Sequence, residues 1–160
     1  MKRILVLLPV LALSLVASGV SLAQENPFVG TWKLNVAKSK YSGGQLAKSE
    51  TRTVVAQGDG EKVTYEGIAA NGDPISYSYT SNLDGKDSPL SGTSTPSGAD
   101  TVAITRVDAN TYTSILKKAG KTVRTTRTVV SKDGKVLTIT GKGMNTQGQP
   151  ISYTAVFDKQ

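Results

Sequence analysis

The chain has 160 residues, a formal net charge of +7, and neither cysteine nor histidine. This composition excludes disulfide bonds, thiol nucleophiles, lipid attachment to a processed cysteine, and the histidine ligands of common zinc and haem sites. The length is that of one domain. The basic residues are scattered, which favours a solubilising role over nucleic-acid binding, although such a surface could also contact an anionic lipid or polymer.

Residues 1–23 have the pattern of a secretory signal peptide. Lys2 and Arg3 precede an apolar run over residues 4–16, and Ser21-Leu22-Ala23 places small residues at the cleavage positions. We expect a mature domain of residues 24–160 that is secreted or periplasmic and has no stable membrane insertion. The alternative is an uncleaved N-terminal membrane anchor.

The segment from Phe28 to Leu34 is predicted to be the opening strand. Phe28, Gly30, Trp32 and Leu34 share one parity and the polar residues Thr31, Lys33 and Asn35 take the other, a pattern typical of a strand with one buried face. Trp32 is the only tryptophan of the chain. A large ring on a buried face is interpreted as a structural plug of the core.

The rest of the chain predicts a β fold without long helices. Residues 35–48 show no sustained helical period and are expected to form a loop with at most one helical turn near residues 36–41. From Ser49 onward, turn signals recur about every ten residues. This spacing predicts an all-β domain, a single antiparallel up-and-down barrel of eight to ten short strands, with a sandwich as the alternative.

The sequence contains an internal repeat. Thr51-Arg52-Thr53-Val54-Val55 recurs as Thr126-Arg127-Thr128-Val129-Val130, and Gly72-Asp73-Pro74-Ile75-Ser76-Tyr77 recurs as Gly148-Gln149-Pro150-Ile151-Ser152-Tyr153. We therefore expect two copies of a three-strand unit. A pair of such units that closes one barrel buries both apolar faces and pairs edges that would otherwise be exposed.

Apolar and aromatic residues alternate with Ser and Thr along the later strands, which indicates a water-soluble barrel with an apolar lumen. A tyrosine offers an apolar ring and a hydroxyl, which suits a mostly apolar ligand with few polar atoms. The alternative is a lumen filled by its own side chains. The predicted ligand-binding residues on the inward faces are Tyr65, Tyr77, Tyr79, Tyr112, Ile139, Tyr153 and Phe157.

Arg127 is the predicted polar anchor of the lumen. It shares the parity of Val129, and an inward guanidinium in a low-dielectric space is unfavourable unless an anion pairs with it. Its copy Arg52 shares the parity of Val54, and Arg106 is a weaker second candidate. The alternative is that one or both repeated arginines point outward or lie at a rim.

Catalytic chemistry has little support in the sequence. Histidine and cysteine are absent, and most carboxylates lie beside glycine in predicted turns, as Asp59 and Asp133 do. We predict no catalytic residues, no metal site and no cofactor.

Two motifs resemble the calycin superfamily, which comprises lipocalins, fatty-acid-binding proteins and their relatives. The segment Phe28 to Leu34 resembles the opening of intracellular fatty-acid-binding proteins, and its Gly30-Thr31-Trp32 core is shared with lipocalins. The segment Gly120 to Val130 resembles the hairpin that leads into a strand with a ligand-facing arginine, and Asp133-Gly134-Lys135 resembles the following turn. The resemblance implies a lipocalin-like barrel in which Trp32 plugs the closed end and Gly30 is structural.

The same resemblance has departures. The final strand contains Ala155-Val156-Phe157-Asp158-Lys159 where the fatty-acid-binding proteins have the Arg and Tyr that grip a carboxylate, and the loop at residues 35–48 replaces their helical lid. With a signal peptide in front, the chain is similar to exported bacterial lipocalin-like domains.

Three functions follow from these observations. The first is a non-enzymatic, monomeric carrier of a small hydrophobic molecule, with or without an acidic group. The second is an envelope interaction protein with a filled barrel, which binds partners through its surface or the loop at residues 35–48. The third is an enzyme built on a calycin barrel.

Overall fold

The computed structural model describes residues 26–160, so the predicted signal peptide and its cleavage position lie outside the described residues. The described part contains twelve strands and two short 3-10 helices. Their bounds are β1 (Gly30–Leu34), η1 (Val36–Lys38), β2 (Lys40–Ser42), β3 (Ser49–Gln57), β4 (Gly60–Ile68), β5 (Pro74–Ser81), β6 (Asp84–Pro89), β7 (Ser91–Thr93), η2 (Pro96–Gly98), β8 (Thr101–Asp108), β9 (Thr111–Lys118), β10 (Lys121–Val130), β11 (Val136–Met144) and β12 (Pro150–Lys159). Over these residues, no helix is both long enough and apolar enough to cross a membrane.

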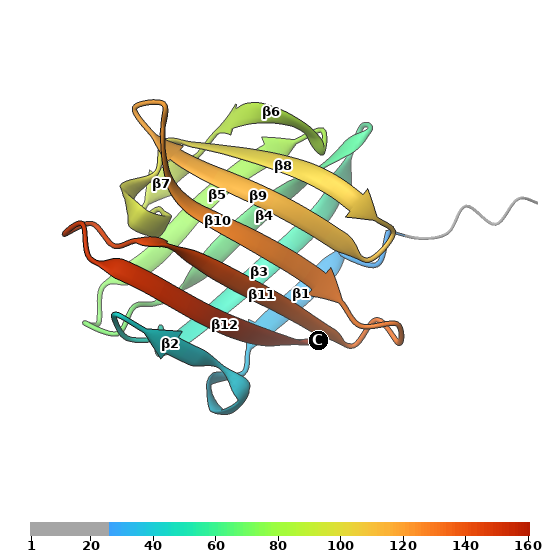
Figure 1. The fold of residues 1–160 in the computed structure, drawn as a ribbon. Helices are drawn as coiled ribbons and strands as arrows, with labels where there is room; N and C mark the ends of the chain where they lie inside the picture. The colour runs from blue at the N-terminus through green and yellow to red at the C-terminus, as the bar shows by residue number, and fades with distance from the viewer. Residues whose placement is uncertain (1–25) are drawn as a thin grey trace, which may run out of the picture.

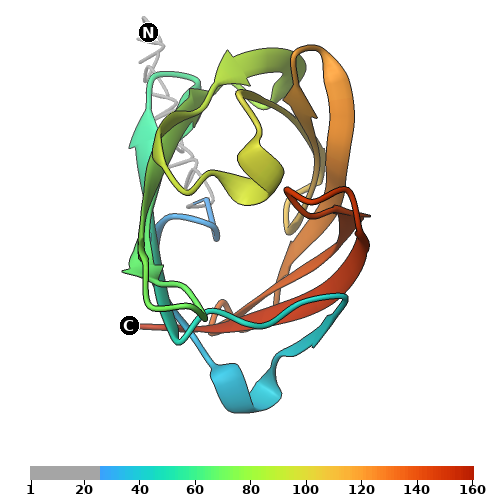
Figure 2. The same cartoon turned by 90° about the vertical axis from the view of Figure 1, so that its left-hand side faces the viewer.

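The strands form one antiparallel sheet in the order β6-β8-β9-β10-β11-β12-β1-β3-β4-β5-β7, with β2 on the edge of β12 (Figure 1). The two ends of the sheet meet where β5 contacts β6, so the sheet curls into a nearly closed barrel (Figure 2). The predicted all-β up-and-down barrel is confirmed. The strand count exceeds eight to ten because the three-residue strands β2 and β7 supplement the longer ones.

The repeat corresponds to two three-strand meanders. Strands β3, β4 and β5 pair in succession, and β10, β11 and β12 do the same. The two units form opposite walls of the barrel (Figures 1 and 2). Strand β1 joins them, because it pairs with β12 on one side and β3 on the other.

The segment expected to be a loop is partly ordered. Asn35 caps η1, since its side chain accepts a hydrogen bond from the backbone N–H of Lys38. Strand β2 then pairs with β12 through Tyr41 and Tyr153, whose rings stack with centroids 5.4 Å apart. The loop prediction is therefore wrong for residues 40–42, because the edge of β12 beyond β1 is free to pair with them.

One end of the barrel is closed by aromatic packing. Phe28 and Trp32 are fully buried, and the ring of Phe28 stacks on Tyr112 at 3.7 Å between centroids. The indole N–H of Trp32 donates a hydrogen bond of 2.9 Å to the carbonyl of Phe28, which satisfies the only polar group of that ring. At Gly30, with φ of +134°, a Cβ would lie 2.9 Å from the Lys159 side chain.

Candidate functional site

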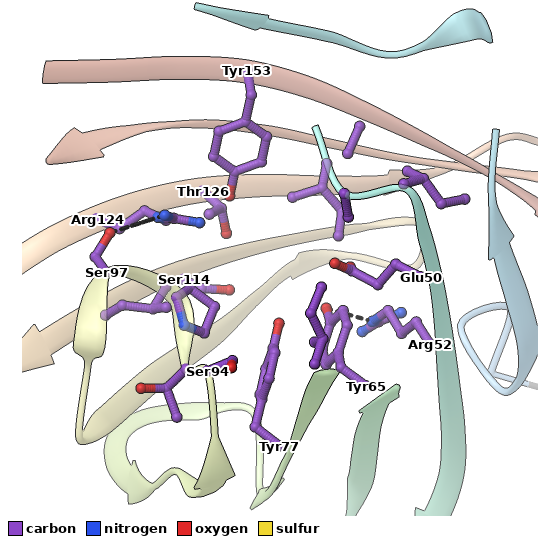
Figure 3. Close-up of a pocket in the computed structure, with 18 of the residues that line it drawn as sticks. Glu50, Arg52, Tyr65, Tyr77, Ser94, Ser97, Ser114, Arg124, Thr126 and Tyr153 are labelled. Atoms are coloured by element: carbon purple, nitrogen blue, oxygen red, sulfur yellow. Dashed lines mark hydrogen bonds between the residues drawn. The ribbon is translucent and has the colours of Figure 1, made fainter. Parts of the chain in front are cut away.

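The opposite end of the barrel opens into a cavity of about 340 Å³. Both three-strand walls contribute residues, and the loops around residues 45–47, 69–70 and 94–97 form its mouth. Figure 2 views the barrel along its length from the side of the strand β7, and Figure 3 shows part of the cavity lining. The barrel is therefore not filled by its own side chains.

Seven predicted ligand-binding residues line this cavity: Tyr65, Tyr77, Tyr79, Tyr112, Ile139, Tyr153 and Phe157. They come from β4, β5, β9, β11 and β12, so the topology collects them from both walls. Their positions agree with the predicted inward faces. Whether they contact a ligand stays a prediction.

Arg127 does not line this cavity, and the prediction that its side chain faces the lumen is wrong. It is exposed, while Thr128 and Val130 on the same strand are buried. Thr128 and Val130 lie opposite Ile139 and Leu137 of β11, which also face inward. Successive residues of a strand point to opposite faces, so Arg127 points outward.

The repeated partner Arg52 is the arginine that is buried inside the barrel, with 2% of its surface exposed. Its Nε donates a 2.9 Å hydrogen bond to the hydroxyl of Tyr65, and one terminal nitrogen lies 3.8 Å from Oε1 of Glu61. The other terminal nitrogen is buried without a hydrogen-bond partner. Burial lowers the pKa of Arg52, but Tyr65, Tyr79 and Glu61 raise it by more, so the group stays cationic.

Glu61 is the counter-charge at the base of this cluster. Its side chain is fully buried, and burial raises its pKa above the usual value despite the opposing influence of Arg52. The hydroxyl of Tyr112 lies 3.4 Å from Oε2, whereas Oε1 has no hydrogen bond. The guanidinium of Arg52 and the carboxylate of Glu61 therefore form an ion pair whose 3.8 Å separation is too long for a hydrogen bond.

A second cation, Arg124, lies nearer the mouth (Figure 3). Its guanidinium donates two hydrogen bonds to the hydroxyl of Ser97, at 3.1 and 2.9 Å, and stands 5.2 Å from the ring centre of Tyr153. Only neutral groups bond to it directly. Two guanidinium groups, Arg52 and Arg124, therefore border one apolar space.

Glu50 also borders the cavity and is partly buried. Burial raises the pKa of its carboxyl group to about 7, although the charges of Arg124 and Arg52 oppose the shift. At neutral pH this residue is therefore protonated in a substantial fraction of molecules. The lumen becomes more positive as the pH falls below 7.

The mouth strap, defined as residues 91–100, crosses the open end between β6 and β8 (Figure 2). The hydroxyl of Ser97 donates to the carbonyl of Met144, and that of Ser94 donates to the carbonyl of Pro74 at 2.9 Å. Both serines have left-handed backbones, with φ of 58° and 60°. Arg124, through Ser97, ties the strap to the opposite wall.

The tyrosines supply neutral hydroxyl groups inside the barrel. Burial raises the pKa of Tyr65, Tyr77 and Tyr79, and it raises the pKa of Tyr153 to about 12. The rings of Tyr65 and Tyr77 stack at 4.6 Å between centroids. The cavity thus combines flat apolar faces with hydrogen-bond donors, and no cluster of three potential metal ligands occurs in residues 26–160.

Glu50 and Arg124 were not predicted to face the lumen. Arg124 shares the parity of Thr126 and Thr128. Because these neighbours are polar, the sequence of β10 does not indicate that this parity faces the lumen. The usable signal was its pairing with β11, since Leu137 and Ile139 have a clear alternation and lie opposite Val130 and Thr128.

A comparison with solved structures finds matches of low sequence identity, including the following three. A zebrafish ileal bile acid-binding protein, complexed with cholic acid, has 14% identity and a TM-score of 0.49 over 84% of this chain and 99% of its own. Apocrustacyanin C2 has 11% identity and a TM-score of 0.45 over 88% of this chain and 64% of its own. The siderocalin Ex-FABP has 10% identity and a TM-score of 0.37 over 84% and 74% of the two chains.

The strand order and the contact between β5 and β6 define a nearly closed, antiparallel β-barrel. No family model matches the sequence, and a comparison with curated proteins finds no significant match.

Proposed function

We propose that this protein binds and carries a small, mostly apolar molecule that bears an acidic group. The observation that carries the proposal is the lumen itself, in which Arg52 and Arg124 border a cavity of about 340 Å³. Small-molecule sites span about 300–1,000 Å³, so this lumen suits a compact ligand. Aromatic and aliphatic walls supply the apolar contact.

The charges favour an acid over a neutral molecule. Arg124 donates only to a serine hydroxyl, and Arg52 retains one buried terminal nitrogen without a partner. An anion that accepted hydrogen bonds from either group would satisfy donors that the protein leaves free. The protonated fraction of Glu50 leaves this positive charge partly uncompensated at neutral pH.

Calorimetric titration with decanoate and decanol tests the proposal, since the two share a chain and differ in charge. We expect decanoate to bind more tightly to the parent protein. Arg124→Gln should weaken decanoate binding by about tenfold or more, the loss expected for a charged hydrogen bond, and leave decanol binding unchanged. Equal affinity of the parent for both compounds would contradict the acidic-ligand assignment.

Two further variants locate the binding. Arg127→Gln removes the same charge three residues along β10 but from the outer surface, so decanoate binding should be retained. Ser114→Phe places a ring in the cavity that Ser114 lines, so both compounds should lose affinity. If Ser114→Phe is folded by circular dichroism and still binds both compounds, the lumen is not the binding site.

The carrier is proposed to act outside the cytoplasm, in the periplasm or the medium. This proposal is supported by the signal-peptide pattern of residues 1–23. Mass determination of the exported protein tests it, and the expected mature chain begins at Gln24. Recovery of the full-length chain in the cytoplasm alone would contradict it.

A further inference from the structure

A groove of about 630 Å³ lies on the outer face of the wall formed by β2, β12, β11 and β10, which lie side by side in Figure 1. Strand register arranges its outward side chains in two rows across the wall. One row is Arg127, Thr140, Thr154 and Lys40, and the other is Thr125, Lys142, Ser152 and Ser42.

The groove carries three exposed cations, Arg127, Lys142 and Lys40. None of them forms an ion pair in the described part of the chain, and no Asp or Glu of residues 26–160 lines the groove. Elsewhere on the surface, Lys38, Lys86 and Lys117 form ion pairs, Lys117 with Asp87 at 2.8 Å. At about 4.8 Å per strand, Arg127 and Lys40 lie roughly 14 Å apart, with Lys142 in the adjacent row.

Hydroxyl groups fill the space between these cations. Thr140 and Thr154 separate Arg127 from Lys40, and Ser152 separates Lys142 from Ser42. Hydroxyls accept and donate hydrogen bonds in a hydrated setting, and cations provide the attraction for negative charge. The surface therefore complements an extended molecule with many hydroxyls and regularly spaced acidic groups.

Other anionic partners fit less well. None of the large apolar residues that are exposed in the described chain lines the groove, so nothing here would enter a lipid bilayer. Tyr41 and Tyr153 border the groove, but their rings stack on each other on the lumen side of the wall. The groove thus lacks the exposed aromatic platforms on which single-stranded nucleic acids stack.

We propose that this outer groove binds an acidic polysaccharide, with Arg127, Lys142 and Lys40 contacting its acidic groups and the Ser and Thr rows contacting its hydroxyls. Tyr41, Thr126 and Tyr153 border both the groove and the lumen, but none of the three cations lines the lumen, and the proposal does not depend on the carrier function. The groove would hold the carrier on an anionic glycan while the mouth of the barrel stays open.

Binding of alginate, a polymer of uronic acids, to the mature protein on a biosensor surface tests the proposal, with neutral dextran as the comparison polymer. We expect binding of alginate and not of dextran. The double variant Arg127→Gln/Lys142→Gln should weaken alginate binding by about tenfold or more. The matched variant Lys62→Gln/Lys132→Gln removes the same charge from exposed positions outside the groove and should stay within about twofold of the parent.

Three results would overturn the proposal: equal losses in both double variants, no alginate binding by the parent, or tighter binding of poly-dT or anionic lipid vesicles than of alginate. Decanoate titration of the double variant Arg127→Gln/Lys142→Gln tests separately whether the lumen still binds its ligand. Retained decanoate binding shows that the barrel is folded, and it leaves the carrier function untouched whatever the alginate result.

Discussion

The two copies of Thr-Arg-Thr-Val-Val have the same residues and opposite orientations. In β3, Arg52 and Val54 are buried, whereas in β10 Arg127 is exposed and Thr128 and Val130 are buried. The hairpin register does not differ, since Arg52 lies opposite Tyr65 and Arg127 lies opposite Thr140, thirteen positions later in each case. Neither the motif nor the hairpin register therefore determines whether the arginine faces inward or outward.

The partner strand supplies the difference. In β4 the inward residues are Val63 and Tyr65, while in β11 they are Leu137 and Ile139, one position earlier in the repeat. The motif itself has apolar residues of both parities, so it accepts either orientation. A one-residue shift in the neighbouring strand turns the whole hairpin over and moves one arginine from the core to the surface.

The largest expected effect is on the free energy of unfolding when each arginine is replaced in turn. Arg52→Leu leaves Glu61 buried without its counter-charge, so urea unfolding should show a loss of about 3–5 kcal/mol in the free energy of unfolding. Arg127→Leu removes an exposed group and should change that free energy by less than about 0.5 kcal/mol. Similar losses for the two variants would contradict the assigned orientations. Adding Glu61→Leu to Arg52→Leu should recover part of the stability.

A pH series sharpens the contrast, because the first copy is preceded by Glu50 and the second by Thr125. The folded protein raises the pKa of Glu50 from 4.5 to about 7, so it holds this proton more tightly than the unfolded chain does. Stability from this group is therefore present below pH 4.5 and is lost as the pH rises to 7. The expected loss is about 2–3 kcal/mol.

Unfolding measurements at pH 5 and pH 8 on the parent and on Glu50→Gln give this contribution as a difference between the two proteins. Decanoate affinity should fall over the same range, since ionised Glu50 offsets the charge of Arg124. An identical pH response of the two proteins would exclude this role for Glu50.

The smallest expected effect concerns the third strand of each unit. Tyr77 lies opposite Tyr65, whereas Tyr153 lies opposite Gly141, and a Cβ at Gly141 would overlap the Tyr153 ring. Gly141→Ala should displace that ring and cost about 1–2 kcal/mol of unfolding free energy. Ultraviolet circular dichroism of the tyrosines would report the displacement. An unchanged spectrum and an unchanged free energy of unfolding would show that the methyl group is accommodated without displacing the Tyr153 ring.

Strand alternation and turn spacing were sufficient to predict the barrel, because β1, β4, β5 and β12 carry most of their apolar residues on one parity. The same alternation identified seven residues that line the lumen, including Tyr77 and Tyr153. It failed for β10, where Val129 and Val130 are adjacent and the other residues are polar. Arg124 and Glu50 lie on strands without a strong apolar reference, so only pairing with a neighbouring strand reveals their direction.

Residues 40–42 were missed for a related reason. A three-residue strand has too few positions to display a period, and its formation depends on the unpaired edge of β12. Long-range pairing of this kind leaves no local trace in the sequence.

The hydrogen bonds between Arg124 and Ser97 have a kinetic consequence. The guanidinium of Arg124 borders the cavity and also donates hydrogen bonds to Ser97 of the mouth strap. An anionic ligand and Ser97 would therefore compete for the same N–H donors. Binding of an anion to Arg124 would weaken its hydrogen bonds to Ser97, and release of the anion would restore them. In the proposed carrier, we therefore expect the strap to be held less firmly in the loaded protein than in the empty one.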